Sequence, residues 1–145
     1  MALSLIGLAR LGAADSMQMP MKSDMPMKSE ILAAYVKISA ALAADDLKAA
    51  QAAAAEVADH AGMAKKNADL AAKAQAVADA ADLAKARESF KALSTAIEPL
   101  ATGEKDYVVM HCPMMKADWV QTGTAVKNPY YGKSMLTCGA PKKSS

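Results

Sequence analysis

The sequence predicts an all-α protein, an up-and-down antiparallel bundle of about four helices with an irregular Cys/Met segment folded over it. Alanine supplies most of the 53% hydrophobic content, and alanine is the strongest helix former. Four stretches between residues 30 and 103 place apolar residues at steps of three and four, as amphipathic helices do. After Gly103 alanine becomes scarce and most of the reactive side chains appear. A chain of 145 residues accommodates one domain, which we place at residues 30–140.

Each expected helix has its own signals. The first begins at Glu30, and its apolar stripe consists of Ile31, Tyr35, Ile38 and Leu42. Asp45 and Asp46 interrupt the apolar pattern and can cap a second helix from Leu47 to Gly62. A third stretch covers about residues 64–80, and the clearest helix covers residues 83–100, where Pro99 and Gly103 close it. Short connections between the helices favour antiparallel neighbours.

Composition and motifs argue against several functions. Seventeen basic and fifteen acidic residues give a net charge of +2, which is too small and too evenly spread for a nucleic-acid partner. No apolar run approaches the roughly 18 residues that a membrane-spanning helix needs. The sequence contains no Gly-rich phosphate loop, zinc-protease helix or nucleophile elbow. The adjacent His111 and Cys112 do not by themselves form a catalytic dyad, so we expect no enzyme.

The first 29 residues predict export followed by a metal-collecting tail. Residues 1–14 resemble the second half of a secretory signal peptide, which indicates a periplasmic protein. Residues 15–29 contain two prolines and a repeated MPMKS unit, so we expect a flexible tail. Thioethers are soft ligands that prefer Cu(I) or Ag(I). The tail is therefore either a weak copper-capturing segment or an oxidation-prone linker. Its methionines are Met17, Met19, Met21, Met25 and Met27.

The C-terminal segment contains both cysteines of the chain, Cys112 and Cys138. Thiolate, thioether and imidazole ligands suit Cu(I) and, less exclusively, Zn(II). The other candidate ligands near the cysteines are His111, Met114, Met115 and Met135. His60, at a predicted helix end, is a further candidate, although such a histidine is more often a surface or capping residue. Alternatively, the cysteines form a disulfide that closes a loop of about 25 residues and contributes roughly 3 kcal/mol.

Aromatic and turn residues lie between the cysteines. Asn128-Pro129 and Gly132 are turn signals, so this segment is expected to fold back over the bundle in short turns. Trp119, Tyr130 and Tyr131 are read first as packing residues that anchor it. Residues 141–145 are expected to form a disordered tail.

Three strings together resemble a known bacterial family. They are AYVKISAALAADDLKAA from Ala34, DLAKARESFKALSTAI from Asp82, and above all CPM…W…NPYYG…ML.CG from Cys112 to Gly139. The chain is identified as similar to domain of unknown function 3347 over about residues 30–140. That family occurs as small exported proteins and as a domain attached to the periplasmic adaptor subunits of heavy-metal efflux pumps. Its members often have a longer insertion before the tryptophan, whereas only Met115 to Asp118 intervene here.

The resemblance implies an envelope protein associated with copper or silver resistance. Its motif positions in this chain are Cys112, Pro113, Met114, Trp119, Asn128, Pro129, Tyr130, Tyr131, Gly132, Met135, Leu136, Cys138 and Gly139. The leading hypothesis is a Cu(I)-binding protein that uses Cys112, Cys138 and Met114, with Ag(I) or Zn(II) as other candidate ions. The alternative is a disulfide-closed helical module that docks on an efflux adaptor or another envelope protein and has no metal site.

Overall fold

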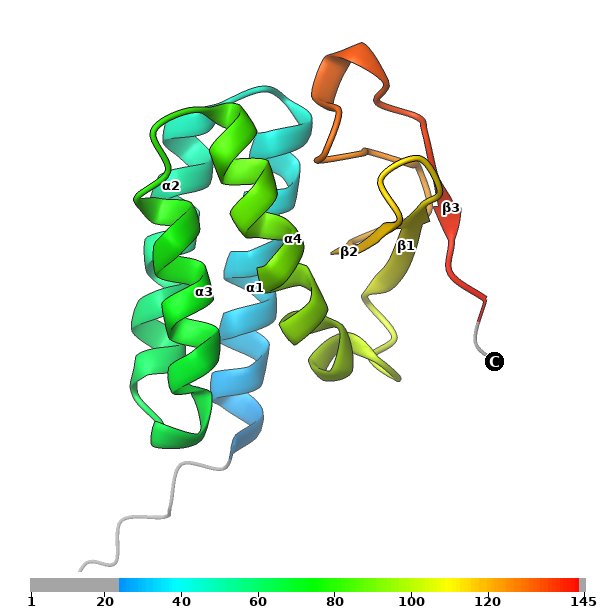
Figure 1. The fold of residues 1–145 in the computed structure, drawn as a ribbon. Helices are drawn as coiled ribbons and strands as arrows, with labels where there is room; N and C mark the ends of the chain where they lie inside the picture. The colour runs from blue at the N-terminus through cyan, green and yellow to red at the C-terminus, as the bar shows by residue number, and fades with distance from the viewer. Residues whose placement is uncertain (1–23, 144–145) are drawn as a thin grey trace, which may run out of the picture.

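Four α-helices form the larger part of the molecule, as the sequence predicts. The computed structural model describes residues 24–143. The helices are α1 (Asp24–Ala43), α2 (Leu47–Gly62), α3 (Ala68–Ala78) and α4 (Leu83–Ala101). They run up and down, and each contacts the next along the chain (Figure 1). The predicted stripe on α1 is fully buried in the core, which confirms that periodicity.

Local side-chain chemistry sets several helix ends. Asp46 caps α2 by accepting a 3.0 Å hydrogen bond from the Ala49 amide, and Asp82 caps α4 by accepting one of 2.8 Å from Lys85. Helix α1 begins at Asp24, six residues before the predicted Glu30. Pro26 lies in its first turn, where a proline costs no intrahelical hydrogen bond. Residues 24–29 of the expected flexible tail therefore belong to α1.

The predicted third helix is shorter than expected. A 3₁₀ turn from Lys65 to Asn67 precedes α3, which ends at Ala78. Helix α4 continues through Pro99 to Ala101, about as predicted.

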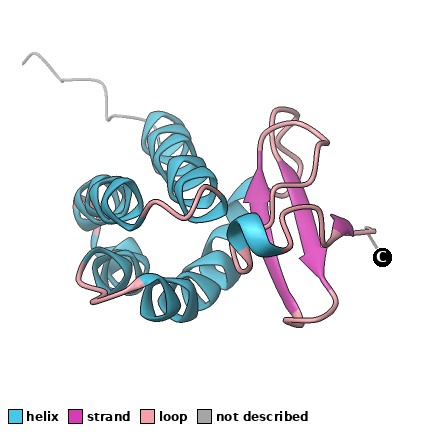
Figure 2. Ribbon diagram, turned by 90° about the horizontal axis from the view of Figure 1, so that it is seen from above, coloured by secondary structure: helices cyan, strands magenta, loops and turns pink. Residues whose placement is uncertain are grey.

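The all-α prediction is wrong for the C-terminal segment, which contains a three-stranded antiparallel sheet. Its strands are β1 (Val108–Cys112), β2 (Ala117–Gln121) and β3 (Ala140–Pro141), in the order β2-β1-β3. Figure 2 shows the sheet packed beside the helices. The longer strands have only five residues, and their connection lacks the Asn-Gly or Asp-Gly signal of tight hairpins. Lys116 makes the turn with a φ of 49°. Strands of five residues are too short to show a clear alternation of apolar and polar residues, so the sequence pattern did not predict them.

An aromatic row joins the sheet to the bundle. The ring of Tyr35 on α1 stacks on Phe90 of α4 with centroids 5.1 Å apart. Phe90 lies 5.8 Å from Tyr130, and Tyr130 meets Trp119 of β2 edge-on at 6.2 Å. All four rings are buried. Trp119 and Tyr130 therefore pack the C-terminal segment against the bundle, whereas Tyr131 is only half-buried.

The last described residues are paired, although residues 141–145 were expected to be disordered. Pro141 lies opposite Met110 in the β1–β3 ladder. The Lys142 amide then donates a 2.8 Å hydrogen bond to the Val109 carbonyl. The ladder therefore continues at least to Lys142. Within residues 24–143, no helix combines the length and apolar character needed to cross a membrane.

Candidate functional site

Asn128 organises the NPYYG turn and connects it to Cys138. This side chain is completely buried. Its Oδ1 accepts hydrogen bonds from the Tyr130 amide at 2.8 Å and the Tyr131 amide at 3.3 Å. Its Nδ2 donates to the Cys138 carbonyl at 2.6 Å, and its backbone amide donates to Leu136 at 2.7 Å. One buried amide therefore holds the turn and the second cysteine in a single arrangement.

Arg87 and Asp45 hold the same turn against the bundle. Arg87 on α4 donates to the Pro129 carbonyl at 2.8 Å and to the Leu42 carbonyl at 2.9 Å. It also contacts Asp45 Oδ1 at 2.6 Å, and this hydrogen bond holds the pKa of Asp45 below its usual value. The backbone of Gly132 lies so close to Asp45 that a Cβ on this residue would be 1.9 Å from Asp45 Oδ1. Only glycine fits at this contact.

The glycine after Cys138 lies against the indole of Trp119. A Cβ on Gly139 would lie 2.7 Å from Trp119 Cη2 and 3.0 Å from the His111 carbonyl oxygen. The φ of Gly139 is 138°, which side chains rarely adopt. Trp119 and Gly139 together therefore direct the chain back across β1, so that Cys138 approaches Cys112.

The structure brings the two cysteines together. Cys112 ends β1 and is fully buried, whereas Cys138 is half-buried, and both thiols are free. Burial raises the pKa of the Cys138 thiol, and the hydrogen-bonding Cys112 thiol raises it further. Two adjacent thiols, one of them accessible from the surface, can bind a soft metal ion as thiolates or be oxidised to a disulfide.

The three methionines predicted as ligands in the C-terminal segment lie close to the two cysteines in the sequence. Met114, in the turn after β1, is 61% exposed, and Met135 is 38% exposed. Met115 is half-buried against the core. The Met135 carbonyl accepts a 3.1 Å hydrogen bond from the Cys138 amide, which closes a turn between them. Each cysteine therefore has a methionine within three residues, and the thioethers of Met114 and Met135 reach the surface.

His111 does not join the thiols, because successive residues of a strand point to opposite faces. Cys112 is buried and His111 is exposed. The His111 Nδ1 lies 2.6 Å from Asp118 Oδ1, and Lys142 reaches Asp118 Oδ2 at 2.7 Å. Burial would raise the pKa of Asp118, but hydrogen bonds from Lys142 and His111 outweigh it and lower that pKa.

His60 lies in the last turn of α2 and also remains apart from the thiols. Its Nδ1 is 3.6 Å from Oε2 of Glu30 on α1, so its partner belongs to the helical bundle. Met17, Met19 and Met21, like the predicted signal segment 1–14, lie outside the described residues. Met25 and Met27 belong to α1.

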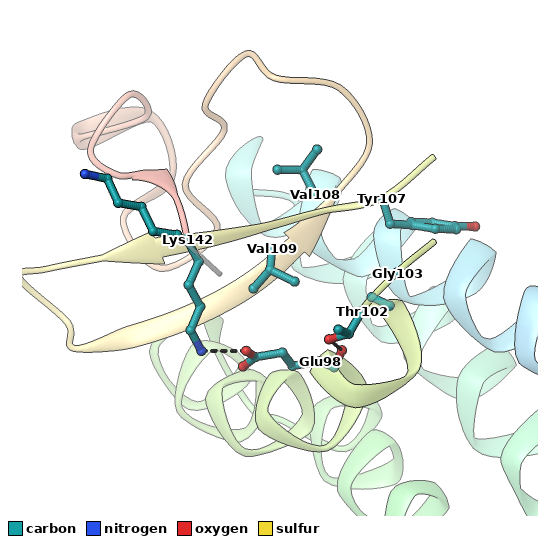
Figure 3. A pocket seen from close by; sticks show the side chains of 9 residues that line it. Glu98, Thr102, Gly103, Tyr107, Val108, Val109 and Lys142 are labelled. Carbon is teal, nitrogen blue, oxygen red and sulfur yellow. Dashed lines mark hydrogen bonds and ion pairs between the residues drawn. The ribbon is translucent and has the colours of Figure 1, made fainter. Parts of the chain in front are cut away.

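Two of the open hollows beside the sheet lie near candidate residues. One, of about 510 Å³, is lined by Pro113 and Gly139, which directly follow the two cysteines, together with His111 and residues 140–143. The other, of about 550 Å³, lies between the end of α4 and β1 (Figure 3). In Figure 3 Lys142 reaches Glu98 across this second hollow. Its lining contains no cysteine, histidine or methionine.

Across residues 24–143, no three His, Cys, Asp or Glu side chains are placed to hold one metal ion together. An ion at the two thiols would therefore take any further ligand from a thioether or the backbone. Sequence reasoning missed the supporting roles of Asp45 and Arg87. A usable signal was Arg87 itself, the only arginine among the lysines of the helical region, since a guanidinium is suited to several simultaneous hydrogen bonds.

Comparison with known proteins identifies the family of the chain. Searches of curated proteins and of solved structures found no match. The model of one family matches residues 31–107, from α1 to the residue before β1. This is the helical part of the region in which the sequence resembles that family. Since the match covers more than half of the chain, the protein belongs to the family described as "Protein of unknown function (DUF3347)".

Proposed function

We propose that the protein binds Cu(I) at Cys112 and Cys138 and acts as a carrier or sequestering factor in copper handling in the bacterial periplasm. The observation that supports this most directly is the hydrogen-bonding interaction between the two thiols, of which one is buried and one half-buried. Asn128, Gly139 and Trp119 hold the backbone that creates this contact. The motif therefore serves to position the sulfur atoms.

The donor set favours Cu(I) over Zn(II). Soft thiolate and thioether ligands select Cu(I), whereas structural Zn(II) sites take four ligands. Both histidines of the chain are engaged elsewhere, His111 with Asp118 and His60 with Glu30. Two thiolates with the thioether of Met114 or Met135 would satisfy Cu(I) or Ag(I). Zn(II) usually takes four ligands, and beside the two thiolates this site offers no nitrogen or oxygen side chain to supply the other two.

Burial couples metal binding to proton release. The raised pKa of Cys138 keeps its thiol protonated at neutral pH, and a thiol must lose its proton to bind metal. Cu(I) entering at the half-buried Cys138 would displace that proton. The Met-rich segment before α1 would capture ions weakly and raise their local concentration near the thiols.

A Cu(I) titration tests the proposal. The full chain is reduced and titrated anaerobically with Cu(I) against a chromogenic chelator. We expect one ion to be held against the chelator, and we expect Cys112→Ser/Cys138→Ser to lose it. Met63→Leu, which changes an exposed methionine at the end of α2, is the matched control and should bind as the parent does. Equal competition by the double serine variant would refute the proposal.

Single thioether variants then identify the third ligand. Replacement of a coordinating methionine by leucine, at either Met114 or Met135, should weaken Cu(I) binding about tenfold, the equivalent of 1.4 kcal/mol. If both replacements leave the affinity unchanged, the ion is held by the two thiolates alone and the assigned thioether is wrong.

The same thiol contact also favours a second candidate, a disulfide-closed interaction module. The Cys138 thiol interacts with the Cys112 thiol, and in the oxidising periplasm two neighbouring thiols can be joined as a disulfide. Alkylation and mass spectrometry of protein recovered from the periplasm distinguish the two functions. Free or metal-blocked thiols support copper binding. Complete oxidation, together with a thermal stability that Cu(I) does not change, supports the interaction module, whose partner would be an efflux adaptor or another envelope protein.

A further inference from the structure

The net charge of +2 conceals a separation of charge along the chain. Residues 107–143, which contain both cysteines, have five lysines and one acidic residue, Asp118. The rest of the chain has twelve basic and fourteen acidic residues. The C-terminal segment is therefore basic, whereas the remainder is slightly acidic. A basic surface of this kind steers a partner of the opposite charge toward itself.

The acidic groups near this segment are already paired, and most of its lysines are not. Asp118 contacts Lys142, which also contacts Glu98. Asp45 is paired with Arg87. Within residues 24–143, no carboxylate forms an ion pair with the other four lysines of the segment, all of them exposed: Lys116, Lys127, Lys133 and Lys143. Their positive charge is available to a partner.

A hollow of about 510 Å³ lies in this basic segment beside the cysteines. Pro113 and Gly139 of its lining directly follow Cys112 and Cys138 in the chain. The other lining residues are His111, Ala140, Pro141, Lys142 and Lys143. The lining therefore combines apolar residues with an imidazole and two ammonium groups, and it contains no carboxylate.

The sheet edge beside the hollow favours recognition by side chains. Strand β3 lies at the edge of the sheet, with β1 on its inner side, and Figure 2 shows this edge facing away from the helices. Pro141 has no amide hydrogen to donate, so it interrupts any ladder that an added strand would form there. A partner segment at this edge would instead be held by an apolar side chain in the hollow and by charge.

Exposed apolar side chains lie close to both cysteines in the sequence. The described chain exposes four large apolar side chains, and three of them lie within three residues of a cysteine: Met114, Met135 and Leu136. Lys116 follows Met114 by two residues, and Lys133 precedes Met135 by two. Exposed apolar groups with a charged surround are typical of a protein interaction surface.

We propose that the hollow beside the cysteines binds an acidic segment of a partner protein, which places an apolar or thioether side chain between Pro113 and Gly139. Lys143 and Lys116 would contact the carboxylates of that segment. A second copy of this chain would bring the same lysines together, so like charges oppose a symmetric dimer at this face. Trp119 is buried, so the face also lacks the exposed tryptophan that anchors proteins at a membrane surface.

The position of the hollow gives this docking a purpose. A partner bound there would lie next to Cys112 and Cys138, where it would exchange Cu(I) with the thiols. Only this exchange rests on the proposed function, because the docking itself needs no metal.

A titration of the reduced, metal-free full chain tests the docking. Nitrogen-15-labelled protein is titrated with a short synthetic peptide in which two methionines are flanked by glutamates, and binding is followed by NMR. We expect the amide signals of Gly139, Ala140 and Lys143 to shift. The affinity should fall at least about tenfold between about 20 and 200 mM salt. A peptide with lysines in place of the glutamates should not bind, and one with serines in place of the methionines should bind more weakly.

Variants of the protein locate the contact. Lys116→Glu/Lys143→Glu should weaken peptide binding about tenfold. Lys127→Glu is the matched control, because the Lys127 side chain lines a different hollow against α1, and it should weaken binding less than about twofold per unit of charge changed. Ala140→Phe, which fills part of the hollow, should abolish binding. Ala52→Phe, at an exposed position of α2, should leave it unchanged.

Each opposite result contradicts the docking site. If Lys127→Glu weakens binding as much as the double variant does, only net charge matters and no site exists. Binding that survives Ala140→Phe excludes the hollow. Equal binding of the glutamate and lysine peptides, or binding only to vesicles of phosphatidylglycerol and phosphatidylethanolamine, also overturns the proposal.

Two features keep these outcomes interpretable. Circular dichroism shows whether each variant is folded, and the comparison of peptides and salt concentrations uses the parent chain alone. Since the protein is free of metal, the results do not depend on whether the Cu(I) proposal holds.

Discussion

Replacement of the buried amide of Asn128 should destabilise the C-terminal segment more than any surface amide replacement. In Asn128→Ala the Cys138 carbonyl loses its 2.6 Å hydrogen bond, and the Tyr130 amide loses one of 2.8 Å. The longer 3.3 Å contact to Tyr131 is lost as well. A buried group left without its partner costs about 1–3 kcal/mol. Two strong contacts and one weak contact therefore predict a loss of about 3 kcal/mol in the free energy of unfolding, out of about 5–15 kcal/mol for a typical domain.

Urea denaturation of the reduced protein measures this loss. Trp119 is the only tryptophan of the chain and is buried beside Tyr130, so its fluorescence reports unfolding of the C-terminal segment. Asn67→Ala is the matched control, because Asn67 donates only to a methionine sulfur, and it should cost less than about 1 kcal/mol. A loss below 1 kcal/mol for Asn128→Ala would refute the role assigned to the buried amide.

Asn128→Asp separates positioning of the thiol from stability of the turn. The carboxylate keeps the acceptor for the Tyr130 amide but places an oxygen instead of a donor against the Cys138 carbonyl. We therefore expect a displaced Cys138 and about tenfold weaker Cu(I) binding, the equivalent of 1.4 kcal/mol. Unchanged Cu(I) affinity in this variant would show that Asn128 does not position the thiol.

Three further predictions follow from the same contacts. Gly132→Ala should cost about 3 kcal/mol of stability, because its Cβ would meet Asp45 and its φ is 58°; Gly62→Ala, with open space around it, is the control in the same urea titration. The lowered pKa of Asp118 contributes stability above its unfolded value of about 3.9, and this contribution disappears as pH falls through the lower folded value. Asp118→Asn should therefore have a lower free energy of unfolding at pH 7 and lose less of it when the pH is lowered. If the free energy of unfolding of this variant falls with decreasing pH as steeply as that of the parent, the prediction is wrong. Because the pKa of Cys138 is raised, Cu(I) affinity should increase at least about tenfold per pH unit between pH 6 and 8, and a flat profile would exclude thiol deprotonation.

Much of the helical architecture could be predicted from local pattern, and the C-terminal fold could not. The stripe at Ile31, Tyr35 and Ile38 and the cap at Asp46 depend on neighbours a few residues away, so periodicity and capping chemistry were sufficient. The start of α1 was placed six residues late, because a proline in the first turn of a helix resembles a proline that prevents one. The sheet was missed because its five-residue strands are stabilised by the bundle and by each other rather than by their own sequence pattern.

The candidate site divides in the same way. The sequence by itself determined which donor atoms are present and indicated that Cys112, Cys138 and the methionines are the soft ones, because donor chemistry belongs to the residue type. Only the tertiary structure decided which donors meet. Strand alternation turns His111 away from Cys112, a helix packing contact pairs His60 with Glu30, and the Asn128 hydrogen bonds with the Gly139 turn bring Cys138 to Cys112. Those contacts join residues far apart in the chain, and their geometry is set by the packing of the whole domain.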